Sequence, residues 1–123
     1  GRAPRVTGTD YATPDGSCVR AYVHVGDLAI SHVAAAQPLA AGRTLLPAYN
    51  LGSGAGLSVL QIMDAMKRIT GVAFTPDVGP RRPGDPDRIV AEGTAASADL
   101  KWQMRHTVDD MVASAWSARR AHR

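Results

Sequence analysis

The 123-residue sequence has a single cysteine, Cys18, and few aromatic residues: one phenylalanine, two tryptophans and three tyrosines. One cysteine excludes an internal disulfide framework and fits a reducing cytoplasm. No apolar run approaches the roughly 20 residues that span a bilayer, so we expect no membrane partner. The net charge is only +3, and few aromatic residues accompany the basic ones. Composition therefore does not indicate a nucleic-acid partner either.

Arginine dominates the basic residues, because only Lys67 and Lys101 among the 14 are lysines. Arg20 and Arg82 each lie where a strand-like run meets a loop. A guanidinium presents several donors in one plane and binds phosphate oxygens bidentately, so two arginines from distant segments favour an anionic nucleotide ligand. Asp85, close after Arg82, offers an acceptor suited to vicinal ribose hydroxyls. Together the three residues predict a site for a nucleoside diphosphate.

The first half of the chain reads as a strand followed by a helix. Residues Tyr22 to Val25 form an apolar strand-like run, and Asp27 is a good N-cap for a helix that starts there. Pro38 and Gly42 then predict a connector. The helix is expected to bury one face, made of Val25, Leu28, Ala29, His32, Val33 and Ala36.

The middle of the chain predicts a second strand and helix. Ala48 to Leu51 reads as a short buried strand, and Ser58 with Gln61 forms the capping box of the next helix. Gly71 stands in the C′ position that ends it. The strand and this helix resemble one βα unit of a parallel sheet. The helix is expected to bury a stripe made of Val59, Ile62, Met63, Met66 and Ile69.

The remaining segments complete an α/β pattern. Val72 to Thr75 and Ile89 to Ala91 read as extended structure. A last helix follows Thr107, which pairs with Asp110 in a variant of the capping box. Its apolar face contains Val108, Met111, Val112 and Ala115.

The glycine-rich run from Gly52 to Gly56 invites comparison with a dinucleotide-binding loop. Its spacing is G-x-G-x-G, one residue short of G-x-G-x-x-G, and Ser58 already caps the helix that follows. We therefore interpret the run as a tight turn that allows close packing.

Three motifs carry a family resemblance: the run from Arg20 to Ala29, the run from Tyr49 to Val59, and the run from Pro80 to Pro86. In order and spacing they resemble the C-terminal third of UDP-glucose 4-epimerase, an extended short-chain dehydrogenase/reductase. The resemblance runs from about Val6 to Trp116. It implies the C-terminal part of a Rossmann-type fold with the smaller substrate-binding lobe, so that residues 1–123 form a substrate-binding portion.

The family places its NAD-binding glycine loop and its catalytic Tyr-x-x-x-Lys pair before this region. Neither Lys67 nor Lys101 has a tyrosine four residues before it. We expect no catalytic residue and no NAD loop in this chain, although the resemblance implies NAD as cofactor of the full-length enzyme. The chain then reads as a fragment, a truncated reading frame or an excised domain whose partner is the absent N-terminal portion. A homodimer of the full-length enzyme is compatible with the resemblance.

Carried over by motif, the resemblance gives individual residues roles in binding UDP. The family commonly has a phenylalanine at the position of Thr7, where its ring packs on uracil, so here only backbone could read the base edge. Arg81 is as well explained by a solvated charge as by a ligand contact. The resemblance implies that Arg20 and Arg82 contact the diphosphate and that Asp85 contacts the ribose. It further implies that Tyr22 lines the pocket and that the backbone of Val6 and Thr7 contacts the base.

The implied reaction interconverts UDP-glucose and UDP-galactose through a 4-keto intermediate, with hydride passing to and from bound NAD. Another nucleotide-sugar epimerase or dehydratase of the same family, and a non-catalytic nucleotide-binding or NAD-binding module, remain alternatives. His24 and His32 read as packing histidines, and no metal is expected. A nucleic-acid binder is a further alternative, resting on Arg81, Arg82, Arg88, Arg119, Arg120 and Arg123.

Overall fold

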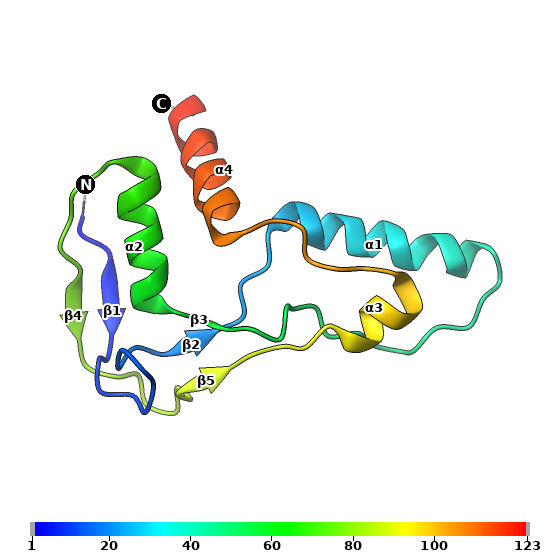
Figure 1. Ribbon diagram of the computed structural model, residues 1–123, viewed down its shortest axis with the longest axis horizontal. Coiled ribbons are helices and arrows are strands. Elements are labelled where there is room, and N and C mark those ends of the chain that lie inside the picture. The colour runs from blue at the N-terminus through cyan, green and yellow to red at the C-terminus, as the bar shows by residue number, and fades with distance from the viewer. Residues whose placement is uncertain (1, 123) are drawn as a thin grey trace.

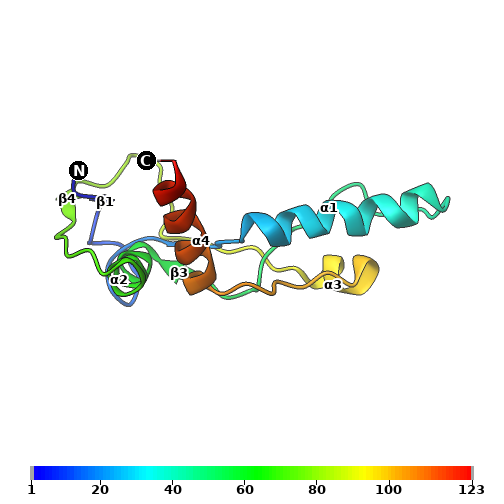
Figure 2. The same cartoon turned by 90° about the horizontal axis from the view of Figure 1, so that it is seen from above.

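The computed structural model describes residues 2–122, so Arg123 lies outside the described residues. The helices are α1 (Val25–Ala40), α2 (Val59–Thr70), α3 (Thr94–Leu100) and α4 (Val108–Ala121). The strands are β1 (Arg5–Thr7), β2 (Val19–Arg20), β3 (Leu57–Ser58), β4 (Asp77–Gly79) and β5 (Arg88–Ile89). The molecule is elongated, with α1 and α3 at one end and α2, α4, β1 and β4 at the other (Figure 1). Seen from above it is also thin (Figure 2).

The strands form two small sheets. β1 pairs with β4 in parallel, and β2 lies between β3, which is antiparallel to it, and β5, which is parallel. The predicted strand from Tyr22 to Val25 is wrong, because β2 ends at Arg20 and Val25 already begins α1. The run from Val72 to Thr75 is not paired, and the strand predicted from Ile89 begins and ends earlier.

The predicted strand from Ala48 to Leu51 is also wrong. A strand requires a neighbour to satisfy its backbone groups, and no other segment of residues 2–122 pairs with this one. Helix α2 instead follows β3, so the predicted parallel βα unit is not formed among the described residues.

Helices α2 and α4 begin as predicted. The Ser58 hydroxyl accepts from the Gln61 N–H at 3.1 Å, and the Gln61 side chain accepts from the Ser58 N–H at 2.8 Å. Gly71 ends α2 with φ 68°. Thr107 and Asp110 form the second capping box. The two helices pack together, and the Asp109 carboxylate of α4 binds both terminal nitrogens of the Arg68 guanidinium on α2.

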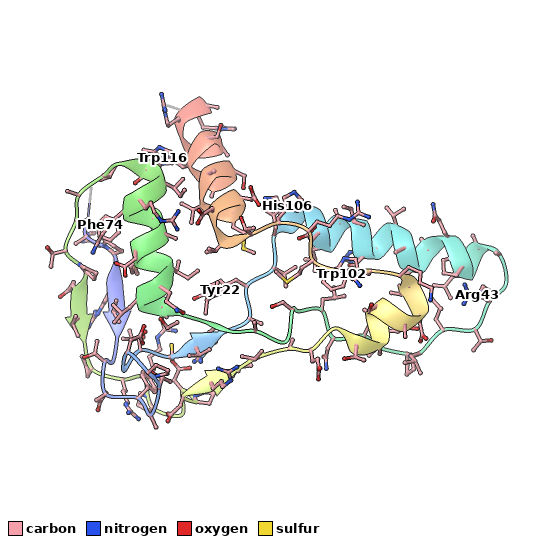
Figure 3. All side chains as sticks on the ribbon, viewed as in Figure 1. Tyr22, Arg43, Phe74, Trp102, His106 and Trp116 are labelled. Atoms are coloured by element: carbon pink, nitrogen blue, oxygen red, sulfur yellow. The ribbon has the colours of Figure 1, made fainter. Side chains whose placement is uncertain are left out.

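The start of α1 differs from the prediction, because its N-cap is His24, whose Nδ1 accepts from the Gly26 N–H at 2.9 Å. The Asp27 carboxylate instead accepts hydrogen bonds from the backbone N–H groups of Arg105 and His106 at 3.1 and 3.0 Å, and it pairs with the His106 ring at 2.8 Å. It holds the segment before α4 against α1, where Figure 3 shows His106. Pro38 does not end α1, which continues to Ala40.

The apolar face predicted for α1 is exposed rather than buried. Val25 is 76% exposed and Val33 57%, whereas the inward side carries the buried polar residues Asp27 and Ser31. The stripe predicted on α2 is only partly buried, with Met63 in the core and Ile62, Met66 and Ile69 half-buried. The core is correspondingly small, with Val6, Tyr11, Cys18, Val19, Met63, Ala65, Ala96 and Trp102 as its apolar members.

The accessible surface is large for the chain length. It measures 8113 Å² for a mass of 12.9 kDa, whereas a compact monomer of this mass exposes roughly 6,300 Å². The excess of about 1,800 Å² includes the outer face of α1, so this fold leaves an apolar surface without cover.

Candidate nucleotide-binding site

Arg20 and Asp85 meet where β2 ends. The parallel pairing of β2 with β5 brings the two segments together, with the Ala21 N–H donating to the Ile89 carbonyl at 3.0 Å. The Arg20 Nη2 lies 2.5 Å from the Asp85 Oδ1, and its Nη1 donates to the Val19 carbonyl at 2.8 Å. Both side chains are partly exposed. A guanidinium has five N–H donors, so Arg20 keeps donors free for an anion at this surface.

A tight turn places Arg82 beside Asp85. The Asp85 N–H donates to the Arg82 carbonyl at 3.2 Å, with Pro83 and Gly84 between them. Gly84 has φ 77°, which a β-turn of type II requires at this position and which glycine adopts without strain. Arg82 is exposed, and within residues 2–122 it forms no ion pair. Its assignment to the diphosphate stays a prediction.

Arg81 takes a structural position. Its Nε lies 2.7 Å from the Asp10 carboxylate, its Nη1 lies 3.8 Å from that of Asp87, and its guanidinium covers the Tyr11 ring at 4.1 Å from the centroid. The hydrogen bond to Asp10 is the main reason that the pKa of Arg81 is raised and that of Asp10 lowered. Arg81 therefore secures the loop that contains Tyr11.

Tyr11 is a residue to which sequence reasoning gave no role of its own. Its side chain is buried, and its hydroxyl donates to the Asp85 Oδ2 at 3.4 Å. Burial first, and then the Asp85 charge, raise the pKa of Tyr11. The available signal was its place in the Pro/Gly/Asp-rich stretch from Gly8 to Gly16. That composition predicts a surface turn, but it does not show that the turn folds onto Asp85.

The two residues predicted to read the base lie on β1. Pro4 and Gly8 both hydrogen-bond to β4 through their backbones. Because backbone groups alternate in direction along a strand, those of Val6 also face β4 and those of Thr7 face away. Val6 is buried and Thr7 half-buried. Thr7 is thus the better placed of the two to offer a free N–H and C=O.

Tyr22 lies in different surroundings from the arginines. It lines an apolar cavity of about 300 Å³ between α2 and α4, beside Met66, Met111 and Trp116. Figure 3 shows Tyr22 and Trp116 on either side of this space. Burial is the main reason that the pKa of Tyr22 is raised. The four residues Val108, Met111, Val112 and Ala115 share this face of α4, as predicted.

The glycine turn from Gly52 to Gly56 packs against the segment that follows β5. A side-chain carbon on Gly52 would lie 2.2 Å from the Ala91 carbonyl oxygen. The Gly54 N–H already donates to that carbonyl at 3.1 Å, and the Ala55 N–H to the Ser53 hydroxyl at 3.2 Å. The first amides of α2 are likewise engaged, including that of Val59 by the Cys18 carbonyl. These contacts support a packing role for the turn, and that it holds no cofactor phosphate stays a prediction.

Of the two histidines predicted to be packing residues, only His24 has a structural role. His24 caps α1 and stacks on His106, with ring centroids 4.1 Å apart. His32 is exposed, so its prediction as a packing residue is wrong. Within residues 2–122 there is no group of three metal-ligating side chains, and none of the helices there is long and apolar enough to cross a membrane.

No family model matches the chain. It is 40% identical over 119 residues to UDP-glucose 4-epimerase 4 of Oryza sativa subsp. japonica, and 40% over 118 residues to the UDP-glucose 4-epimerase of Lactobacillus helveticus. Each alignment covers 95% of this chain, but only 32% and 36% of the relatives. A probable UDP-arabinose 4-epimerase from the same Oryza sativa is 40% identical over 122 residues, covering 97% of this chain and 28% of the relative.

Two solved structures extend these similarities to the fold. A UDP-glucose 4-epimerase from Stenotrophomonas maltophila, with NAD and formylated UDP-arabinopyranose, matches 98% of this chain and 35% of its own at 40% identity, with a TM-score of 0.92. One from Bifidobacterium longum, with NAD+ and UDP, matches 98% and 36% at 37% identity, with a TM-score of 0.83. These matches confirm the resemblance to the C-terminal portion of UDP-glucose 4-epimerases and the mixed α/β fold class. The chain spans about a third of the length of these relatives.

Proposed function

We propose that this chain is the UDP-sugar-binding portion of a UDP-glucose 4-epimerase that interconverts UDP-glucose and UDP-galactose. The observation that carries the proposal is the junction of β2 and β5, where Arg20 and Asp85 are held together with Arg82 on the adjoining turn. Two relatives at 40% identity are UDP-glucose 4-epimerases, and one matching structure contains UDP.

In this proposal the chain anchors the nucleotide and leaves the sugar free to turn. Arg20 and Arg82 bind the diphosphate through charge-assisted hydrogen bonds, and Asp85 accepts from the ribose hydroxyls. Two oxygens of a carboxylate offer about four acceptor sites, so the contacts from Arg20 and Tyr11 leave room for two more donors. Binding energy from this non-reacting half of the substrate positions the hexose for the reaction.

NAD belongs to the full-length enzyme of this proposal, where it supplies the hydride chemistry. The glycine turn of this chain does not fit its phosphates, and neither lysine has the Tyr-x-x-x-Lys spacing of the family. We therefore propose that the preceding portion of such an enzyme holds NAD and the catalytic pair, and that this chain alone does not turn over UDP-sugars. The single cysteine fits a cytoplasmic enzyme.

The apolar outer face of α1 supports a covering partner of this kind. Val25 and Val33 point away from the chain's own core, and the excess surface of about 1,800 Å² is more than the roughly 800 Å² that each partner buries in a standard protein interface. In this proposal the N-terminal portion packs there, and the run from Ala48 to Leu51 gains the neighbouring strand that it lacks among the described residues.

Isothermal titration calorimetry of the chain with UDP and with uridine tests the diphosphate site. We expect UDP to bind more tightly, and Arg82→Ala to lower UDP affinity about tenfold, the effect of one charge-assisted hydrogen bond. Arg43→Ala is the matched control, because Arg43 is also exposed and lies at the far end of α1 (Figure 3). Equal binding of UDP and uridine by the unmodified chain would contradict the proposal.

A UDP-pentose epimerase is the second candidate, favoured by the 40% identity to the probable UDP-arabinose 4-epimerase. The phosphate and ribose contacts would be the same and only the sugar would differ. Competition between UDP-galactose and UDP-arabinose for the full-length enzyme of this proposal separates the two candidate functions. The true substrate is expected to be turned over as well as bound.

A further inference from the structure

The Asp85 carboxylate has a different partner on each oxygen. The Arg20 Nη2 lies 2.5 Å from Oδ1, and the Tyr11 hydroxyl lies 3.4 Å from Oδ2. A partner on each oxygen restrains the carboxylate from rotating to bind the guanidinium with two parallel hydrogen bonds. Arg20 therefore keeps one terminal nitrogen on Asp85 and the other on the Val19 carbonyl, which fixes the plane of its fork.

Tyr11 is itself held rigidly. Its side chain is 4% exposed, and the Arg81 guanidinium covers its ring at 4.1 Å. Gly8 makes this packing possible, because a side-chain carbon there would lie 2.6 Å from Arg81 and 2.7 Å from the Tyr11 ring. The Tyr11 N–H donates to the Gly16 carbonyl at 2.8 Å. The direction of the hydroxyl is thus set by the packing of the whole turn.

We propose that Tyr11 is a positioning residue of the diphosphate site, which holds Asp85 so that Arg20 presents its free donors to phosphate. The proposal rests on the proposed function for its ligand. Without the hydroxyl, Oδ2 is released and Asp85 can rotate to take both terminal nitrogens of Arg20. Asp85 then competes with the diphosphate for the same donors, so a substitution that never touches the ligand weakens its binding.

A first test needs no ligand. In NMR relaxation experiments we expect Tyr11→Phe to change the chemical shift of the Arg20 side-chain Nε–H and to alter its order parameter. Tyr49→Phe is the matched control, because it removes a hydroxyl that also donates to a carboxylate, that of Asp99 at 2.9 Å. An Arg20 signal that Tyr11→Phe leaves unchanged would overturn the proposal, whatever the chain binds.

The buried ring makes a second measurement on the unmodified chain useful, in case Tyr11→Phe does not fold. A hydroxyl that donates to Asp85 inside this packing exchanges its proton slowly with water, so we expect its resonance to be detectable at low temperature. Exchange as fast as that of the most exposed tyrosine hydroxyl would count against the contact and hence against the proposal.

The ligand arm compares UDP with uridine. We expect the preference for UDP to fall about three- to tenfold in Tyr11→Phe and to stay unchanged in Tyr49→Phe, as for partial loss of one charge-assisted hydrogen bond. An unmodified chain without a UDP preference refutes the proposed function and leaves the NMR result to decide on Tyr11. A preference that survives in Tyr11→Phe refutes the positioning role alone.

Discussion

Asp27 offers the sharpest test of how this fold is held together. Its side chain is fully buried and accepts from the N–H groups of Arg105 and His106 and from the His106 ring, at distances between 2.8 and 3.1 Å. These contacts join α1 to the segment that leads into α4. The substitution Asp27→Asn keeps the shape of the side chain and replaces one acceptor oxygen with an NH2 group.

The expected cost follows from the donors around the carboxylate. Asparagine has one acceptor oxygen for the two backbone N–H groups, and its NH2 group then faces the His106 Nδ1, which must give up its proton to accept; the charge that strengthened all three bonds is lost. Hydrogen bonds to charged groups contribute about 1.5–3 kcal/mol each, and an unsatisfied buried donor costs about 1–3 kcal/mol. We expect Asp27→Asn to lower the free energy of unfolding by about 2–4 kcal/mol. With a urea m-value of about 2 kcal/mol/M, this lowers the urea midpoint by about 1–2 M.

Urea unfolding followed by circular dichroism measures this shift. Asp64→Asn is the control, because Asp64 is exposed and its only ion pair among the described residues is a 3.7 Å contact with Lys67 on the same helix; its effect is expected within about 0.5 kcal/mol. A shift for Asp27→Asn no larger than that of the control would mean that these hydrogen bonds do not stabilise the fold.

The remaining predictions concern pH, close packing and the uncovered face. Burial raises the pKa of Asp27, but the hydrogen bonds from His106 and Arg105 together lower it below its ordinary value. The contribution of the Asp27 carboxylate to the free energy of unfolding is therefore full above about pH 4 and is lost as pH falls through the folded-state pKa. Acid titration of Asp27→Asn should lack this loss of stability. Gly52→Ala should cost about 1–3 kcal/mol in urea unfolding, because the added carbon would lie 2.2 Å from a backbone carbonyl; no cost would mean that the turn is loosely packed. On α1, Val33→Gln should change stability by less than about 0.5 kcal/mol, whereas Met63→Ala in the core should cost about 2–5 kcal/mol; equal effects would show that the outer face of α1 is covered within this chain.

Local signals predicted the helix starts that depend on neighbouring residues. Both capping boxes, at Ser58 and at Thr107, involve a residue only three positions ahead, so the sequence contains the whole interaction. Gly71 ends α2 for the same local reason. The helix α3 was not predicted, because no side chain caps it.

Long-range contacts account for the failures. Asp27 was interpreted as an N-cap because its partners, Arg105 and His106, lie 78 and 79 residues away. The apolar face of α1 and the run from Ala48 to Leu51 have a pattern typical of buried elements, but no other segment of residues 2–122 covers or pairs with them. Burial depends on what packs against a segment, which periodicity alone does not reveal.

For the candidate site, the sequence identified the charged residues but not the residues that hold their side chains in place. The structure brings Arg20 and Asp85 into contact and places Arg82 on the adjoining turn. It places Tyr22 in an apolar cavity and shows that Arg81 supports Tyr11. A spacing of 74 residues separates Tyr11 from Asp85, so only the folded chain relates them.

The most direct measurement is a crystal structure of this chain, or of the longer protein that contains it, with UDP bound. We predict guanidinium nitrogens of Arg20 and Arg82 within about 3.2 Å of diphosphate oxygens, and a ribose hydroxyl donating to Asp85. UDP bound at the turn from Gly52 to Gly56, or Arg20 and Arg82 pointing to opposite faces with the diphosphate on neither, would contradict it.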